Sequence, residues 1–323
     1  MYSRPPEWRK PKTICLAWPF DKSLWAENLA PAQQEFLALV NALIGESLLI
    51  LVPHQQALNH LQSLLISSDI SFKIISYGDI WLRDTMPIWL LNQAAQVRLL
   101  CPHFNGWGGK YLFKDDHDLR IRMAREFGLE VVESSLVLEG GAIECNGQGT
   151  VITTEQCLLN PNRHPDLGKD QIEAELKAKL GAHTVIWLNR GLLNDHTDGH
   201  VDTIARFIGP NTVALMMARE TSDPNAQLLL EIKQQLGMSF NLLELPSPGK
   251  IIDEHGEIMP ASYLNFIIGD QVVIMPTYHS HYDQEALAVL RGYFEVPVIA
   301  CSARAILSGG GAFHCMSQEI FRF

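Results

Sequence analysis

The sequence has few basic residues and no long apolar run. Its 25 Lys and Arg are outnumbered by 36 Asp and Glu, which gives a net charge of -11 with neutral histidines. A nucleic-acid-binding protein needs a basic surface to neutralise phosphates, so this balance argues against that class. No segment approaches the roughly 20 uninterrupted apolar residues of a membrane span. Residues 1–12 also lack the apolar run of a secretory signal. We therefore expect a cytoplasmic protein that contacts neither nucleic acid nor membrane.

The cysteine patterns of zinc sites and disulfide frameworks are also missing. Six cysteines are scattered over 323 residues, and none forms a CxxC pair. This usage predicts reduced thiols and no structural zinc. No Pro/Ser-rich linker or low-complexity tract divides the chain, so we predict a single domain over residues 1–323.

Strand-like and helix-like segments alternate along the chain, which predicts a mixed α/β fold. In the first half we expect strands at 13–19, 48–52, 72–76 and 129–132, and helices at 29–44, 54–66 and 118–127. In the second half we expect hairpins at 142–154, 201–216 and 263–275, helices at 171–180, 226–236 and 284–294, and strands at 184–188, 240–245 and 296–300.

The three hairpin turns recur at about 60 residues, which is typical of a repeat architecture. A ring of five strand–strand–helix–strand units would account for the length of the chain. An ordinary α+β sheet with evenly spaced hairpins fits the same periodicity equally well.

A glycine-rich turn precedes a cysteine near the C-terminus. Gly309, Gly310 and Gly311 allow positive φ and close packing, and Cys315 follows shortly after. A thiol placed there could attack a small bound molecule if a base and a binding pocket are also present. Taken alone, the stretch fits a buried, inert thiol better, because buried free cysteines are common.

His200 and Asp202 lie two residues apart where we expect a strand to begin at Val201, so their side chains should share one face. A histidine beside a carboxylate is a compact acid/base and cation-binding pair. A metal site formed by His196, His200 and Asp202 is a weaker interpretation, because residues 197–199 have turn composition. A charged surface turn also fits these residues.

Two further carboxylates interrupt apolar segments. Glu139 follows an apolar stretch at 136–138 and precedes two glycines, so it either orients a neighbouring histidine or belongs to a loop. Arg83 and Asp84 lie between Trp81 and Trp89. They form either an internal ion pair or an aspartate exposed in an aromatic pocket.

The chain resembles the agmatine deiminase and bacterial peptidylarginine-deiminase-type family, within the guanidino-group-modifying superfamily. The matching motifs occur in order from end to end: AWP (17–19), WLRDT (81–85), FNGWGGKY (104–111), EGG (139–141), TTE (153–155), CLLNPNR (157–163), TDGHVDT (197–203), PASYLNF (260–266), GGG (309–311) and HC (314–315). The resemblance implies a five-bladed pseudo-symmetric α/β propeller, the pentein fold, which agrees with the repeat of about 60 residues.

The resemblance also implies a role for each matching residue. Cys315 corresponds to the nucleophile, His200 to the general acid/base, Asp84 and Asp202 to the carboxylates that bind the guanidinium, and Glu139 to the residue that supports the histidine. Paired carboxylates suit a planar cation with five N–H donors. Trp81, Asp79, Trp107, His196 and Gly310 are further candidates for the substrate pocket, and a homo-oligomer is possible.

The expected reaction is hydrolytic deimination of a small cationic guanidino substrate through a covalent Cys315-thiouronium, without metal or organic cofactor. Agmatine, giving N-carbamoylputrescine and ammonia, is the specific prediction. Free or peptidyl arginine, amidino transfer and a non-enzymatic guanidino binder are the alternatives. Two departures bear on the substrate: family members commonly have an acid where this chain has His196, and glycine where it has Met86.

Overall fold

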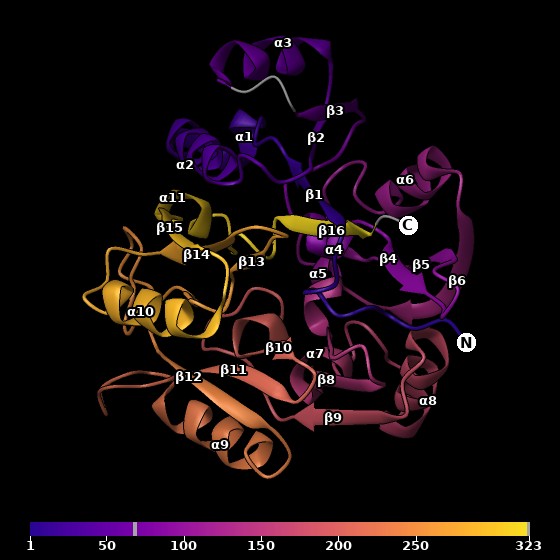
Figure 1. Ribbon diagram of the computed structural model, residues 1–323, viewed down its shortest axis with the longest axis vertical. Coiled ribbons are helices and arrows are strands. Elements are labelled where there is room, and N and C mark those ends of the chain that lie inside the picture. The colour runs from indigo at the N-terminus through magenta and orange to yellow at the C-terminus, as the bar shows by residue number, and fades with distance from the viewer. Residues whose placement is uncertain (67–69, 322–323) are drawn as a thin grey trace.

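A computed structural model describes residues 1–66 and 70–321. The described residues form five small sheets arranged around a common centre, with helices α3, α6, α8, α9 and α10 on the periphery (Figure 1). This arrangement confirms the ring of five units and excludes the single α+β sheet.

Four of the sheets repeat one pattern, in which an antiparallel pair is followed by a helix and a parallel third strand. The strands are β4 (Ile88–Leu91), β5 (Val97–His103) and β6 (Glu130–Val137); β7 (Glu144–Cys145), β8 (Thr150–Thr154) and β9 (Thr184–Leu188); β10 (Ala205–Gly209), β11 (Thr212–Met217) and β12 (Asn241–Pro246); β13 (Ile267–Ile268), β14 (Val273–Thr277) and β15 (Val298–Ser302).

The remaining sheet joins the two ends of the chain. Its order is β16 (Ser317–Phe321), β1 (Lys12–Ala17), β2 (Leu48–Val52) and β3 (Ser71–Ile74). Strand β16 pairs antiparallel with β1, so the C-terminal strand completes the first unit and leaves β1 with a partner on each side.

The helices that cross over within the units are α2 (Leu29–Ala42), α3 (Gln55–Leu64), α6 (Leu119–Phe127), α8 (Lys169–Leu180), α9 (Ala226–Leu236) and α10 (Asp283–Tyr293). The shorter ones are α1 (Lys22–Trp25), η1 (Ala26–Asn28), α4 (Leu82–Thr85), α5 (Gly106–Gly109), η2 (Gly140–Ala142), α7 (Glu155–Leu158), η3 (Val201–Thr203) and α11 (Arg304–Leu307). None of the helices in the described chain is long and apolar enough to cross a bilayer.

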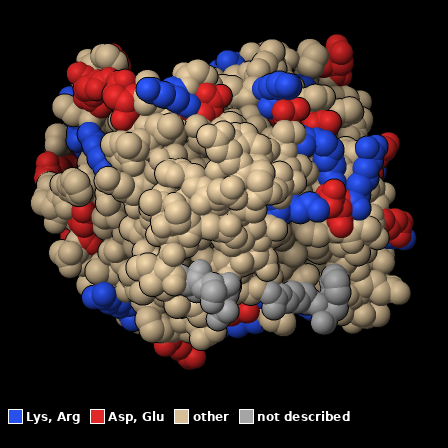
Figure 2. Space-filling model, turned by 90° about the horizontal axis from the view of Figure 1, so that it is seen from above, with Lys and Arg blue, Asp and Glu red and all other residues tan. Residues whose placement is uncertain are grey.

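The surface over α3 has few charges at its centre, and its rim mixes both signs (Figure 2). Helix α3 itself contains no charged Lys, Arg, Asp or Glu. The described residues on this face form no extended basic patch of the kind that a phosphate backbone requires (Figure 2).

The sequence located most elements to within a few residues but misplaced one that matters for the site. Residues 201–203 form the 3₁₀ turn η3, and strand β10 begins only at Ala205. The hydroxyl of Thr203 donates to the carbonyl of His200 at 3.0 Å, and the Ile204 N–H donates to the Val201 carbonyl at 3.0 Å. These local bonds satisfy the backbone as a turn, so the predicted strand start at Val201 is wrong.

Candidate active site

A pocket of about 240 Å³ lies above Cys315, a size suited to a small molecule. Five aromatic side chains contribute to its wall, and its polar groups come from several units of the ring. Its lining includes Trp25, Asp79, Trp81, Asp84, Trp107, Tyr111, Phe113, His196, Gly310 and Cys315. All five pocket residues that the sequence proposed for substrate binding besides the two aspartates therefore lie on this one cavity.

The glycine-rich turn brings Cys315 to the pocket by close packing. Gly310 has φ of 107°, in the left-handed region that favours glycine. A Cβ on Gly309 would lie 2.8 Å from the Trp25 ring, and one on Gly311 would lie 2.7 Å from the Trp81 ring. Side chains at these positions would push the indole rings away, so the turn requires small residues.

The Cys315 thiol is buried and has two polar neighbours. The side-chain NH₂ group of Asn265 donates to Sγ at 3.1 Å. The side-chain oxygen Oδ1 of Asn265 accepts the backbone N–H of Cys315, also at 3.1 Å. The Asp202 carboxylate lies 3.6 Å from Sγ. Burial, followed by the charges of Asp202 and Asp84, raises the pKa of Cys315 well above its usual value. This raised pKa keeps Cys315 as a neutral thiol.

Asp84 presents its carboxylate to the pocket from helix α4. The Trp107 indole N–H donates to Oδ2 at 2.8 Å, and the Gly141 N–H donates to Oδ1 at 2.9 Å. Burial, opposed by the charge of His200, raises the pKa of Asp84 above its usual value. Its neighbour Arg83 forms ion pairs with Glu7 and Glu319 instead. The predicted alternative of an internal Arg83–Asp84 ion pair is therefore wrong, and Asp84 lines the aromatic pocket.

Asp202 lies in η3 and is fully buried. His314 Nδ1 donates to its Oδ2 at 2.7 Å, and its Oδ1 has no partner among the described residues. Although burial favours the neutral acid, the hydrogen bond and charge of His314 hold the pKa of Asp202 below its usual value. Asp202 thus remains ionised beside the thiol.

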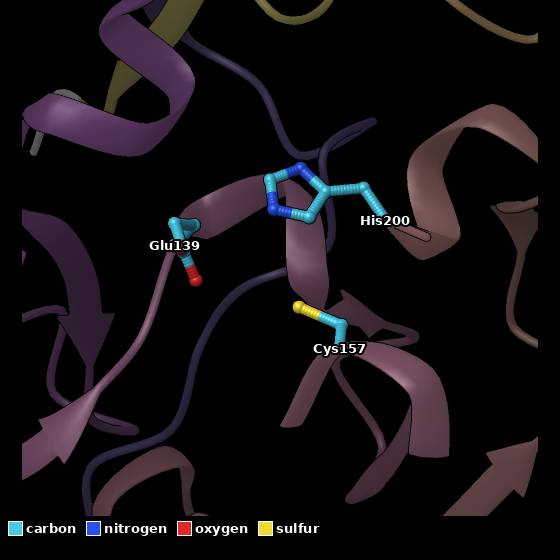
Figure 3. A group of neighbouring side chains, drawn as sticks. All are labelled: Glu139, Cys157 and His200. Carbon is cyan, nitrogen blue, oxygen red and sulfur yellow. The ribbon is translucent and has the colours of Figure 1, made fainter. Parts of the chain in front are cut away.

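His200 lies between Asp84 and the pair Glu139 and Cys157. Its Nδ1 is 3.8 Å from Asp84 Oδ2, and its imidazole extends toward the space between Glu139 and Cys157 (Figure 3). Burial disfavours the imidazolium, but the neighbouring Asp84 carboxylate raises the pKa of His200 to about 10. Neither ring nitrogen has a hydrogen-bond partner among the described residues, although the side chain is 1% exposed. The raised pKa keeps His200 protonated at neutral pH, next to the Asp84 carboxylate and the Cys157 thiol.

Glu139 is fully buried and is paired with a cation. Arg163 Nε donates to both of its oxygens, at 2.9 and 3.1 Å. Arg163 also donates to the Thr197 carbonyl at 2.8 Å and to Asp198 at 2.8 Å. This arginine therefore ties Glu139 to the turn that carries His200.

Asp79 supports the pocket wall. Its two oxygens accept the indole N–H groups of Trp25 and Trp81 at 3.0 and 2.9 Å, and the Ile80 N–H at 2.8 Å. Burial raises the pKa of Asp79 to about 6. With its acceptor positions used in this way, Asp79 orients the two indole rings.

His196 lies exposed at the pocket rim, where the pocket adjoins a larger groove. Within the described ranges, ligand-type atoms come within 4.8 Å of one another in two groups: Glu139, Cys157 and His200, and Glu7, Glu144 and His314. His196 and Asp202 belong to neither, so the metal site built on His196, His200 and Asp202 is wrong. The reason is the turn, which directs His196 outward and His200 inward.

Sequence reasoning missed several residues that contact the predicted ones. Arg163, Asn265 and His314 are part of matching motifs but were assigned no role. The residues that they contact, which are Glu139, Cys315 and Asp202 respectively, were assigned one. Glu7 contacts His314 at 2.9 Å across 307 positions of sequence. No local pattern could have identified a contact at that separation.

The chain is similar to known proteins over almost its whole length. The model of the family described as Porphyromonas-type peptidyl-arginine deiminase matches residues 3–320. A protein of Vibrio parahaemolyticus, provisionally named an agmatine deiminase, is 34% identical over 345 residues, covering 98% of this chain and 96% of the relative.

Two solved structures are also similar. A C. jejuni agmatine deiminase, in a serine-for-cysteine variant with substrate bound, is 30% identical with a TM-score of 0.93, covering 100% of this chain and 97% of that one. An agmatine deiminase of Enterococcus faecalis is 27% identical with a TM-score of 0.92, covering 98% of this chain and 95% of that one.

Proposed function

This chain belongs to the Porphyromonas-type peptidyl-arginine deiminase family, and we propose that it hydrolyses agmatine to N-carbamoylputrescine and ammonia. The observation that carries the proposal is that Cys315 borders both the aromatic pocket, which Asp84 also lines, and a small adjoining cavity, which His200 and Asp202 line. Cys315, His200, Asp84 and Asp202 come from three separated stretches of the chain, and the sequence motifs predict each of them as a site residue.

Asp84 and Asp202 are the groups that would bind the guanidinium. A guanidinium stays charged and presents N–H donors in one plane, so two carboxylates can fix its orientation. Oδ1 of Asp202 has no partner among the described residues and is free to accept such a donor. The substrate cation would also offset the cost of two buried negative charges near the thiol.

Substrate binding would prepare the nucleophile. Burial, followed by the charges of Asp202 and Asp84, keeps the pKa of Cys315 high. A guanidinium between these carboxylates neutralises their field and places a positive charge beside the sulfur, which favours the thiolate. The thiolate therefore forms where its target carbon already lies.

The first half of the reaction then breaks one C–N bond. The Cys315 thiolate forms a C–S bond with the guanidinium carbon, and His200 gives its proton to the departing ammonia. A thiouronium cation remains attached to Cys315. In the second half, neutral His200 takes a proton from water as the water oxygen bonds to the same carbon. The C–S bond then breaks and restores the thiolate, and the product loses the second proton of that water to solvent to leave as the neutral ureide.

The pocket wall favours an amine over an amino acid. None of the described residues that line it is Lys or Arg. The α-carboxylate of free arginine would therefore lack the cationic partner that a buried charge needs. The faces of Trp25, Trp81 and Trp107 suit instead an alkyl chain that ends in an ammonium group.

The test is ammonia release over a panel of agmatine, free arginine and an arginine-containing peptide, with the product identified by mass. We expect kcat/KM for agmatine to exceed that for arginine by at least about 100-fold, since a buried unpaired carboxylate costs several kcal/mol. Equal turnover of arginine would overturn the substrate assignment.

Two controls address the chemistry. Cys315→Ser should abolish turnover while leaving the unfolding temperature close to that of the parent, and trapping of substrate mass on Cys315 in the parent would identify the covalent step. Retained turnover in Cys315→Ser would rule out the thiol as nucleophile. Inactivation by iodoacetamide, with activity surviving a strong chelator, would separate this chemistry from metal-assisted hydrolysis.

A further inference from the structure

The N-terminal segment reaches the centre of the ring, where Glu7 is buried in an ion cluster. Figure 1 shows this segment running inward from the rim. Glu7 is 4% exposed and contacts Arg83 Nη1 at 3.0 Å, His314 Nε2 at 2.9 Å and the Arg206 guanidinium. Burial would raise the pKa of Glu7, but Arg206, Arg83 and His314 hold it well below its usual value. Glu7 is therefore a fixed negative charge.

His314 connects this charge to the active site. Its Nε2 faces Glu7 Oε1 at 2.9 Å, and its Nδ1 faces Asp202 Oδ2 at 2.7 Å. An ionised carboxylate can only accept hydrogen bonds, and a neutral imidazole has a single N–H. With two ionised carboxylates at these distances, both contacts are satisfied together only by a His314 that carries a proton on each nitrogen.

We propose that Glu7 is a positioning residue for the reaction: by holding His314 as a doubly protonated imidazolium, it keeps Asp202 ionised and oriented toward the substrate guanidinium. The inference rests on the proposed function, because it assigns Asp202 the task of binding a guanidinium. It also implies that turnover requires the N-terminal segment, although this segment contributes no side chain to the lining of the pocket.

The charge on His314 matters because it is the nearest cation to Asp202. Coulomb energy falls with distance, so a positive charge at 2.7 Å outweighs the negative charge of Glu7 on the far side of the imidazole ring. The ionisable groups that face Asp202 are His314, Cys315, His200, Asp84, Arg83 and Arg206. Arg83 and Arg206 form their direct ion pairs with Glu319, Glu7 and Glu144, so they act on Asp202 only from a distance.

The test compares pH profiles of kcat/KM for agmatine in the parent and in Glu7→Gln. In the parent, protonation of Asp84 alone should set the acid limb, which is the fall of kcat/KM at low pH, because Asp202 ionises at lower pH. Loss of the adjacent cation should move the pH at which Asp202 ionises upward by about one to three pH units. The acid limb of Glu7→Gln should therefore move to higher pH and become steeper, as two carboxylates now take up protons in the same range, and KM should rise.

Two matched variants separate positioning from a structural role. Glu319→Gln removes an equally buried carboxylate that pairs with Arg83 at 2.7 Å but makes no hydrogen bond to His314. It should lower the unfolding temperature and leave the acid limb in place. Glu7→Asp keeps the charge and should retain the position and slope of the parent limb even if its kcat falls.

Each outcome decides a separate question. A folded Glu7→Gln with an unchanged acid limb overturns the positioning role, while an inactive parent overturns the proposed function instead. If Glu7→Gln does not fold, histidine ¹⁵N NMR of the parent decides, with His200→Gln used to remove the His200 signals. Two bonded protons on His314 at neutral pH support the inference, and a bare Nε2 refutes it.

Discussion

Gly141 offers a sharp test of the site because it touches three predicted catalytic residues at once. A Cβ on Gly141 would lie 2.6 Å from His200 Nδ1, 3.0 Å from Asp202 Oδ2 and 3.2 Å from Asp84 Oδ1. The backbone of Gly141 does not have the left-handed φ that would itself exclude alanine. Gly141→Ala should therefore fold and act directly on the geometry of the site.

The size of the effect follows from the contact distances. To reach an ordinary contact of about 3.5 Å, the His200 ring would have to move by roughly 0.9 Å. Displacements near 1 Å at a reacting centre cost on the order of 100-fold in rate. We expect kcat/KM of Gly141→Ala to fall by about that factor, in steady-state assays of ammonia release, with the larger part of the loss in kcat.

Gly292→Ala is the matched control. Gly292 lies in helix α10, and a Cβ there would meet nothing within 4 Å. This variant should keep full activity and gain about 0.5–1 kcal/mol of stability, because glycine is unfavourable within a helix. If Gly141→Ala kept more than about a third of the parental kcat/KM, the packing of His200 and the two carboxylates would not govern turnover, and the site model would be refuted.

Three further predictions concern single groups. Because the pKa of His200 is raised to about 10, its proton is present below that value. On the basic side kcat/KM should therefore fall as pH rises through about 10, and a basic limb near pH 7 would contradict this. Trp107→Phe removes a hydrogen bond to the Asp84 carboxylate that is worth about 1.5–3 kcal/mol. The acid limb of kcat/KM should therefore move to higher pH by about one to two units, and an unmoved limb would contradict this. Arg163→Met leaves the buried charge of Glu139 unpaired and should cost about 3–5 kcal/mol in denaturant unfolding, whereas a loss below 1 kcal/mol would show that Glu139 is neutral in the fold.

The sequence determined the repeating elements because each one depends on local chemistry. The hairpins around residues 147, 210 and 269 follow from turn residues between apolar segments, and the helices follow from their apolar periodicity. The order of the motifs also identified the family and the residues that were expected to meet. Local patterns failed at 201–203, where side-chain and backbone hydrogen bonds favour a turn over the strand that the apolar composition suggests.

Only the tertiary structure decided how those residues work together. Closure of the ring by β16 brings Cys315 beside Asp202 across 113 positions, and it buries Glu7 against His314 across 307. Neighbours then set the charge states: burial raises the pKa of the aspartate at position 84, whereas at position 202 the hydrogen bond and charge of His314 outweigh burial and lower it. These differences depend on neighbours that are far apart in sequence and on the exclusion of water, and neither is encoded in a local pattern.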